Sequence, residues 1–497
     1  MSRITRLTQP EAPLTRPPTT VLPPTPETPS FLITTATKSY KHQYANIYFL
    51  RLSHLRSSVL EKARERWADA PGNPVYVSKV LEVQKSQLSY IVGTVYMDMP
   101  LKPNVLEDIA RDNSIPPPPP LPTFYSRDDR IMLEDESGRI QLVGERVANA
   151  RLVTGVIIAA LGIETPSGEF EVVDICFAGL APQVQQDVAM EVDDVSKDPW
   201  IAVVSGLDVG SASPADAPIQ LLVEFLTGEG GGPAMQARAA QISRLIIAGD
   251  SLAPLGAPVK QDAFEDEKES KKGRRYGYDT TSFSPHPTLS LSAHLLDIAR
   301  SMPVHLLPGA SDPSGAILPQ QPFPRAMFGA VSSYQSFVCE TNPTYLRIAP
   351  GSDEAPDDTA TRTLLINSGQ PVNDMLKYLA CPPNTPLSIA ESTLRWRHMA
   401  PTAPDTLWCH PYFNSEPFSI DGTPDIYIVG GQKQFGTKMV KDKGDDAKRC
   451  RVVAVPRFAE TGIVVLVNLR NLEVRCVNLH VGGALAGPRP EEETTRQ

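Results

Sequence analysis

Three runs of apolar residues, each followed by a loop that contains Gly and Asp, constrain the fold of this chain more than any other feature. The runs and their loops span residues 201–210, 245–251 and 304–312. Helical patterns at residues 216–226 and 288–301 lie between successive runs. Buried strands that alternate with helices are typical of a layered α/β fold. We therefore predict an α/β region that begins near residue 199.

Further strands are predicted in the C-terminal part of the chain. They fall at residues 363–367, 425–429, 451–455, 462–468 and 472–479. Together with the first three runs they predict a two-sheet sandwich with helices on its outer faces, over residues 199–480. The charged stretch at 256–285, which contains Gly and Ser, is predicted to be a mobile insertion. Residues 481–497 are predicted to form a disordered tail.

The N-terminal part of the chain follows a different pattern. Residues 1–35 contain many Pro and Thr and no apolar periodicity, so we expect a disordered tail, and truncation of residues 1–30 is expected to leave the fold intact. Apolar spacings of three and four then predict a helix from about Tyr44 to about Trp67. The hairpins that follow suit a small Greek-key barrel such as an OB-fold. Residues 36–198 are therefore predicted to hold a helix plus an OB-fold, in a multidomain α+β protein.

Composition limits the partners of the chain. With 47 Lys and Arg against 57 Asp and Glu, the net charge is -10 and the surface as a whole repels phosphate backbones. We therefore expect contact with DNA only indirectly, through a complex. No apolar stretch is long enough for a membrane span, and the six scattered cysteines indicate free thiols in a reducing compartment. A basic cluster at residues 271–275 is either a nuclear import signal or a solvated loop.

The loops after the three apolar runs resemble the metal-binding loops of calcineurin-like phosphoesterases. That superfamily follows such strands with Asp-x-His, Gly-Asp and Gly-Asn-His, because two cations need a bridging carboxylate and flanking ligands. In this chain Gly206 stands in place of the first Asp, and Asp208 in place of its His. Ala310 and Ser311 stand in place of Asn-His. Asp250, the candidate bridging ligand, is retained.

The later ligand positions are also changed. His410 is a possible remaining ligand, whereas Gly431 and Lys433 stand where the last two histidines are expected, and Lys433 would add positive charge. Asp312, in the third loop, could at most contribute to a weak cation site. Because neither cation keeps a complete shell, we predict no catalytic residue, no bound metal and no cofactor. Asp250 is then more simply explained as a cap for the following turn.

Short motifs in a fixed order connect the chain to a known family. They read Q-Y-A-N-I-Y at 43–48, G-D-S at 249–251, L-P-G at 307–309, L-P-Q-Q-P at 318–322, T-N-P at 341–343, S-G-Q at 368–370, R-H-M-A-P-T-A-P-D-T at 397–406 and F-G at 435–436. In order and spacing these motifs resemble the B-subunit family of replicative DNA polymerases, and within it the accessory subunits of polymerase delta. The resemblance covers residues 36–480 and implies an OB-fold joined to a catalytically inactive phosphoesterase domain.

The resemblance also implies partners and a location. A member of this family is expected to act in DNA replication and repair in the nucleus, as a non-catalytic scaffold. It would bind the cysteine-rich C-terminal domain of the polymerase delta catalytic subunit and bridge to a third, regulatory subunit. Pro-rich loops at 318–324 and 401–409 are candidate contact surfaces. The alternatives are an active metal-dependent phosphodiesterase or nuclease, and a single-strand binder that uses the barrel.

Overall fold

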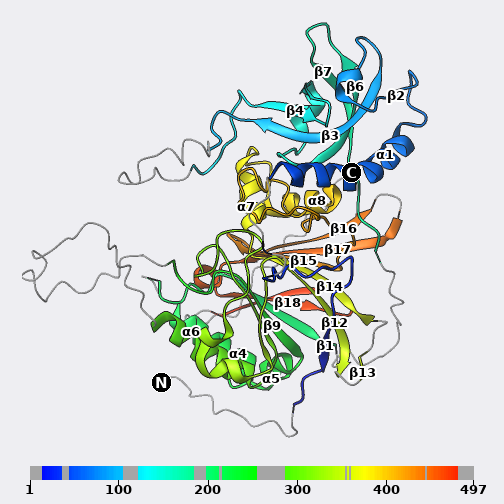
Figure 1. The fold of residues 1–497 in the computed structure, drawn as a ribbon. Coiled ribbons are helices and arrows are strands. Elements are labelled where there is room, and N and C mark those ends of the chain that lie inside the picture. Colours follow the sequence, from blue (N-terminus) through cyan, green and yellow to red (C-terminus); the bar gives the residue numbers. More distant parts are fainter. Residues whose placement is uncertain are drawn as a thin grey trace, which may run out of the picture.

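The computed structural model shows a barrel domain joined to a larger layered domain (Figure 1). The described residues are 14–35, 38, 44–103, 121–183, 198–211, 215–254, 286–352, 355–356, 360–442 and 445–479. Both the insertion predicted at 256–285 and the tail predicted at 481–497 lie outside these ranges. None of the helices in these ranges is long and apolar enough to cross a membrane.

The smaller domain is a closed β-barrel. Its strands are β2 (Val75–Tyr76), β3 (Ser89–Asp98), β4 (Arg130–Glu134), β5 (Arg139–Val143), β6 (Ile157–Glu164) and β7 (Phe170–Cys176), with short helices η1 (Val80–Glu82) and α3 (Glu145–Asn149). The strand order is β2-β3-β4-β5-β7-β6, and β3 also pairs with β6. This last pairing closes the sheet, which removes the exposed edges that an open sheet would carry.

One long helix covers the barrel. Helix α1 (Ala45–Trp67) begins one residue after the predicted start and ends at the predicted residue. Its buried side chains recur every three to four residues, as expected for a helix that presents one face to a sheet. They pack against apolar residues of β3 and β6, in a cluster that includes Leu52, Leu55, Val59, Ala63 and Trp67 on the helix. The hydrophobic face of α1 therefore holds it on the barrel.

The larger domain contains two sheets. The first has the order β1-β12-β14-β15-β17-β16, with β13 paired to β12, and the second has the order β11-β10-β9-β8-β18-β19. The strands of the first are β1 (Thr19–Leu22), β12 (Thr344–Ser352), β13 (Ala355–Pro356), β14 (Arg362–Asn367), β15 (Ile426–Gln432), β16 (Gly436–Asp442) and β17 (Asp445–Pro456). Those of the second are β8 (Trp200–Val204), β9 (Ile242–Ala248), β10 (Val304–Leu307), β11 (Phe337–Cys339), β18 (Ile463–Asn468) and β19 (Val474–Asn478).

The two sheets pack face to face with helices outside them. Apolar residues of β8, β9, β10 and β18 from one sheet and β12, β14, β15 and β17 from the other share one core. Helices α4 (Asp216–Thr227), α5 (Pro233–Ala240), α6 (His286–Ala299) and η3 (Arg325–Ser333) contribute to a second core, on the outer face of the six-stranded sheet. Helices α7 (Gln370–Lys377) and α8 (Pro386–Trp396) lie on the barrel side, and α9 (Phe458–Thr461) follows β17. The predicted helices at 216–226 and 288–301 correspond to α4 and α6.

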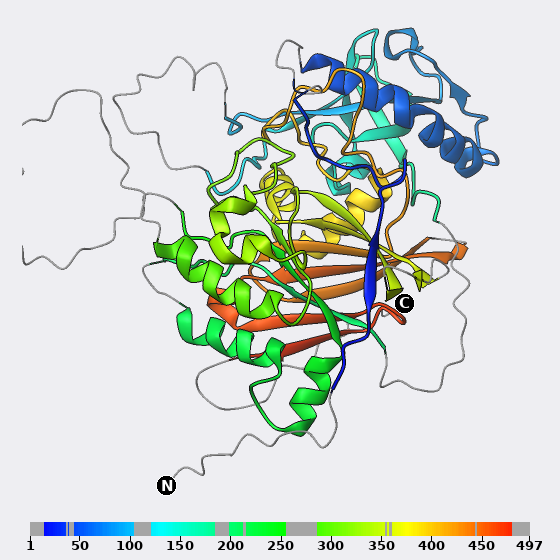
Figure 2. The ribbon, with the colours of Figure 1, turned by 60° about the horizontal axis from the view of Figure 1, so that its bottom comes forward.

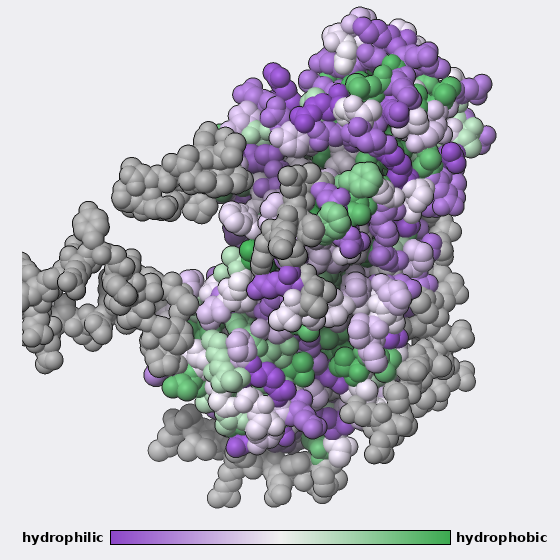
Figure 3. All heavy atoms as spheres, viewed as in Figure 1, coloured by the Kyte–Doolittle hydropathy of each residue, from purple (hydrophilic) through white to green (hydrophobic). Residues whose placement is uncertain are grey.

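A continuous core joins the barrel to the layered domain. It contains barrel residues such as Val95 and Leu133, together with Leu394 and Trp396 of α8. Arg51 of α1 crosses the same junction and donates hydrogen bonds to the carbonyl oxygens of Gly155, Pro401 and Ala403. On the face seen in Figure 3, the barrel end is mostly hydrophilic, whereas hydrophobic residues form patches over the layered domain.

The N-terminal segment, defined here as residues 14–35, corrects one prediction. Residues 1–35 were expected to be a disordered tail, but Thr19–Leu22 forms β1 and pairs antiparallel with β12. Phe31 is 2% exposed and stacks on Tyr345 and Phe418. Figure 2 shows this segment, in dark blue, running along the edge of the sheets towards the barrel. The sequence pattern missed it because an edge strand paired with a distant partner leaves no local periodicity.

Candidate functional site

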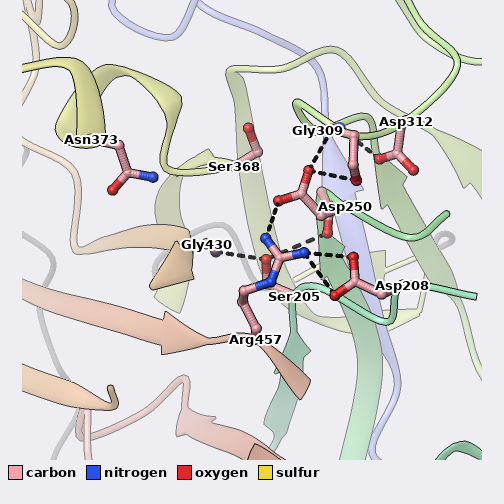
Figure 4. A network of polar contacts seen from close by, with 12 residues as sticks. Ser205, Asp208, Asp250, Gly309, Asp312, Ser368, Asn373, Gly430 and Arg457 are labelled. Atoms are coloured by element: carbon pink, nitrogen blue, oxygen red, sulfur yellow. Dashed lines mark hydrogen bonds and ion pairs between the residues drawn. The ribbon is translucent and has the colours of Figure 1, made fainter. Parts of the chain in front are cut away.

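The carboxyl ends of strands from both sheets converge on one polar network (Figure 4). Strands β8, β9 and β10 run parallel, so the loops that follow them lie at the same edge of the six-stranded sheet. These are the three loops that the sequence singled out, and they carry Asp208, Asp250 and Asp312. From the other sheet, β17 ends at Pro456 and places Arg457 against the same loops. In open α/β sheets this edge is the usual position of functional sites.

Arg457 binds two of the carboxylates. Its Nη2 lies 2.6 and 2.7 Å from the two oxygens of Asp208, and its Nη1 lies 3.1 Å from Asp250 Oδ2. Such charge-assisted bonds from a planar guanidinium are stronger than neutral hydrogen bonds. Burial raises the pKa of Asp208, while the hydrogen bond and charge of Arg457 lower it. Arg457 thus provides the positive charge that these half-buried and buried carboxylates need.

The other oxygen of Asp250 holds the third loop. Asp250 Oδ1 accepts hydrogen bonds from the backbone N–H and the hydroxyl of Ser311, at 3.0 and 3.1 Å. Asp312 turns back into the protein and accepts from the N–H groups of Leu252 and Gly309, at 2.8 and 2.7 Å. Burial raises the pKa of Asp312 to about 7. These two aspartates therefore hold the loops in place, and the partner of Asp250 Oδ1 lies in the third loop rather than in the turn that follows Asp250.

The backbone approaches closely beneath the network. The Ser205 hydroxyl donates to the carbonyl of Ala248 at 2.7 Å and accepts from the N–H of Gly431 at 2.8 Å. A Cβ atom on Gly206 would lie 2.9 Å from Cβ of Arg457, and Gly206 has a φ of +66°. An aspartate at position 206 would therefore conflict with the observed position of Arg457.

Three other residues predicted from the sequence are Ala310, Lys433 and His410. The side chains of Ala310 and Lys433 are exposed. His410 is buried, and its ring meets the ring of Tyr412 edge-on at 5.0 Å. Burial lowers the pKa of His410. Lys433 was expected to add positive charge to the site, but the cation that contacts Asp208 and Asp250 is Arg457. The feature of the sequence that could have indicated Arg457 is a basic residue directly after Pro456, at the end of a predicted strand.

The residues present do not fit a pair of catalytic cations. Three of the expected ligand positions carry Gly or Ala, and the guanidinium of Arg457 contacts both Asp208 and Asp250. Across the part of the chain that the structure describes, no three His, Cys, Asp or Glu side chains are grouped so that they could hold a metal ion. A two-metal site needs a bridging carboxylate with several further N or O ligands on each ion. This network is instead suited to holding loops together.

Two family models match the chain in the order of its two domains. Residues 43–175 match the DNA polymerase delta subunit OB-fold domain, and residues 201–437 match the alpha/epsilon B-subunit of DNA polymerases. The first match confirms the predicted OB-fold for the barrel. Both matches assign the chain to the class of accessory B-subunits of replicative DNA polymerases.

Relatives narrow this class further. The chain is 37% identical to the DNA polymerase delta small subunit of Arabidopsis thaliana, over 87% of this chain and 90% of the relative. It is 32% identical to the DNA polymerase delta small subunit of Saccharomyces cerevisiae, over 89% and 91%, and to DNA polymerase delta subunit 2 of Drosophila melanogaster, over 89% and 94%. The chain therefore belongs to the DNA polymerase delta small subunit family, as its motifs predicted.

Proposed function

We propose that this chain is a non-catalytic scaffold of the polymerase delta complex. In this proposal it binds the C-terminal domain of the catalytic subunit, bridges to a third regulatory subunit and acts in the nucleus, in DNA replication and repair. It contacts DNA only through the complex, in keeping with a net charge of -10. Residues 36–198 form the helix and OB-fold domain, and residues 199–480 form an inactive domain of the calcineurin-like phosphoesterase type.

The ion pairing of Arg457 is the observation that supports the proposed inactivity of the layered domain. Its guanidinium contacts Asp208 and Asp250, the two carboxylates left in the first two strand-end loops. Metal-assisted hydrolysis needs a cation that activates water and polarises the phosphoryl oxygen. A fixed guanidinium next to these carboxylates competes with any such cation for the same oxygens. We therefore infer that the domain has kept the strand-end loops for structural purposes and has lost hydrolysis.

An exposed aromatic surface supports the scaffold role. Trp408 and Phe413 are 62% and 51% exposed, and Phe49 on α1 is 58% exposed. Helix α1 and the loop that contains Phe413 are adjacent, because Asn46 Nδ2 donates a hydrogen bond to the carbonyl of Phe413. Phe49 lies one helical turn after Asn46. Large exposed aromatic side chains are typical centres of protein interfaces. We assign this aromatic surface, which includes part of the predicted loop at 401–409, to the catalytic subunit.

Co-purification with the C-terminal domain of a delta-type catalytic subunit tests this function. The expected result is a one-to-one complex in which metal is found on the partner and not on this chain. Trp408→Ala is expected to weaken the complex by about 30-fold, because a buried aromatic anchor contributes about 2 kcal/mol or more. The matched control is Leu289→Ala, since Leu289 is also 61% exposed but lies on α6.

Two results would contradict the proposal. One is equal binding by Trp408→Ala and Leu289→Ala, which would remove the aromatic surface from the interface. The other is the absence of any complex together with two transition metals retained by this chain alone. In that case hydrolysis of a phosphodiester, lost in Asp250→Ala, would establish the active metal-dependent phosphodiesterase instead.

A further inference from the structure

We propose that Arg457 is a built-in cation that fastens the two sheets of the layered domain together, and that its removal leaves a site for a guanidinium ion or a divalent cation. The inference rests on the proposed loss of the catalytic metal pair at this site. In this proposal the carboxylates of Asp208 and Asp250 have a structural role as the partners of Arg457. Without Arg457 they would bind a cation from solution.

The position of Arg457 is fixed by its backbone. Its N–H donates to the carbonyl of Gln432 at 2.9 Å, and the next N–H, of Phe458, donates to Ser205 at 2.7 Å. The N–H of Ala459 donates to Gly206 at 2.9 Å. These bonds connect the end of β17, in the seven-stranded sheet, to the loop that follows β8 in the other sheet. The backbone of Arg457 is therefore held in place by these bonds, which fixes the point from which its side chain extends to the aspartates.

The two aspartates are held in a backbone conformation that favours glycine. Asp208 and Asp250 have φ angles of +48° and +55°, in the left-handed region that costs most non-glycine residues about 1 kcal/mol or more. Backbone bonds tie their loops together, since the N–H of Asp208 donates to the carbonyl of Asp250 at 3.2 Å. Two carboxylates with this geometry repel each other unless a cation lies between them. Arg457 meets this need with one planar group that contacts both.

The two sheets are therefore joined at this edge by the ion pairs of Arg457 with Asp208 and Asp250, and Arg457 Nε also lies 3.3 Å from the exposed Glu460. The apolar core between the sheets supplies attraction without fixing the positions of the strand ends. The guanidinium fork sets those positions, because each of its terminal nitrogens contacts a different loop. Truncation of the side chain to a methyl group would leave two carboxylates facing an opening the size of a guanidinium. A guanidinium ion from solution, or a divalent metal ion, has the charge to take its place.

Thermal unfolding of the full chain tests the proposal. Arg457→Ala is expected to lower the melting temperature by about 3 to 8 °C, since it leaves two carboxylates uncompensated. Guanidinium chloride, at concentrations too low to unfold the parent, is expected to raise the melting temperature of R457A above its value in equal sodium chloride. Manganese chloride is expected to do the same. Neither salt is expected to raise the melting temperature of the parent protein. Arg300→Ala is the control, because Arg300 forms an exposed pair with Asp297.

The proposal is overturned if R457A and the parent have the same melting temperature. It is also overturned if neither cation raises the melting temperature of R457A more than that of R300A. Should R457A not be recovered in folded form, Arg457→Lys, Asp208→Asn and their double variant are compared. Strong coupling is expected, so that the double variant melts no lower than the worse single variant, and additive losses would overturn the proposal. Manganese-dependent hydrolysis by the parent would instead refute the proposed function, so the two failures are distinguishable.

Discussion

At the scale of single residues, the junction between the domains depends on a buried cluster of charged groups. The side chains of Arg51 and Glu416 are 0% and 3% exposed and lie 3.1 Å apart. His398 places Nε2 3.3 Å from the other oxygen of Glu416. Removal of one member of a buried ion pair is costly because the other is left uncompensated. Burial raises the pKa of Glu416, but the charges and hydrogen bonds of Arg51 and His398 together outweigh it, so the net pKa is lowered to about 2.

The buried His398 predicts a loss of stability in acid. Burial lowers its pKa to about 4, from an ordinary 6.5. The folded protein therefore binds this proton less readily than the unfolded chain, so the contribution of His398 is complete above pH 6.5 and declines as the pH falls to about 4. Between pH 7 and pH 5 this amounts to about 2 kcal/mol. Urea unfolding at both pH values measures it.

His398→Gln is expected to lose less free energy of unfolding between pH 7 and pH 5 than the parent. His54→Gln is the matched control, because His54 is exposed and its pKa is raised by the hydrogen bond to Asp421. A raised pKa has the opposite sign and stabilises the fold as the pH falls below the folded pKa. An identical pH dependence in H398Q and the parent would show that His398 does not titrate in this way.

At the scale of elements, the N-terminal segment holds several distant parts of the layered domain. Arg16 donates hydrogen bonds to the carbonyl oxygens of Leu226, Ala239 and Ile242, near the ends of α4, α5 and the start of β9. Strand β1 then covers the edge of β12. Edge strands are sites of aggregation unless they are covered or charged. The segment thus protects an edge that would otherwise be open.

Deletion of this segment is expected to destabilise the protein, contrary to the prediction made from sequence. A chain that starts at residue 31 loses β1 and the contacts of Arg16, whereas a chain that starts at residue 14 keeps them. We expect faster amide exchange in β12 and greater aggregation for the shorter chain, because the β12 amides lose their partners. Hydrogen exchange and light scattering measure the two effects. Equal exchange in the two chains would mean that β1 contributes no protection.

At the scale of the whole molecule, the domains share one core and one set of buried bonds. The core that contains the barrel residue Val95 also contains Trp396 of α8. In addition, Phe124 lies beyond β3 in the barrel domain, and its N–H donates to Lys377 of α7 at 2.7 Å. Inter-domain interfaces that are large and apolar suppress relative motion. We therefore expect the barrel and the layered domain to unfold together.

Calorimetry measures this cooperativity. The parent is expected to give a single transition with a calorimetric enthalpy equal to the van't Hoff enthalpy. Arg51→Leu is expected to separate the transitions of the two domains, because it breaks the bonds from α1 to Pro401, Ala403 and Glu416. Arg56→Leu is the control, since Arg56 pairs with Glu136 within the smaller domain. Two transitions in the parent would refute the expectation.

The sequence predicted those parts of the fold that have a strong local pattern. Helix α1 and strands β14 and β18 lie within one residue of the predicted bounds, because periodic spacing or short apolar runs define them. Strand β12 and helices α7 and α8 were not predicted, since Pro and polar residues interrupt their apolar patterns. Their structure depends on tertiary packing, which a local pattern does not record.

The candidate site was predicted only in part. The three loops and Asp250 were found, because Gly-Asp after an apolar run is a local signal. Arg457 was missed because it is separated by 207 residues from Asp250, which it contacts. Lys433, which was expected to add the positive charge, stands at one of the expected histidine positions but is exposed in the fold. Long-range ion pairs of this kind become visible only when the strand ends are brought together.

The pairing of β1 with β12 has a consequence for the order in which the chain is made. The Thr20 hydroxyl donates a hydrogen bond to the carbonyl of Gly351, which lies 331 positions later in the sequence. At roughly 5 to 20 residues per second, the ribosome needs about 15 to 65 s to supply the partner of β1. During that interval β1 has no partner strand with which to pair. Strand β1 can therefore reach its final position only after β12 has been made, although it lies more than 300 residues ahead of β12 in the chain.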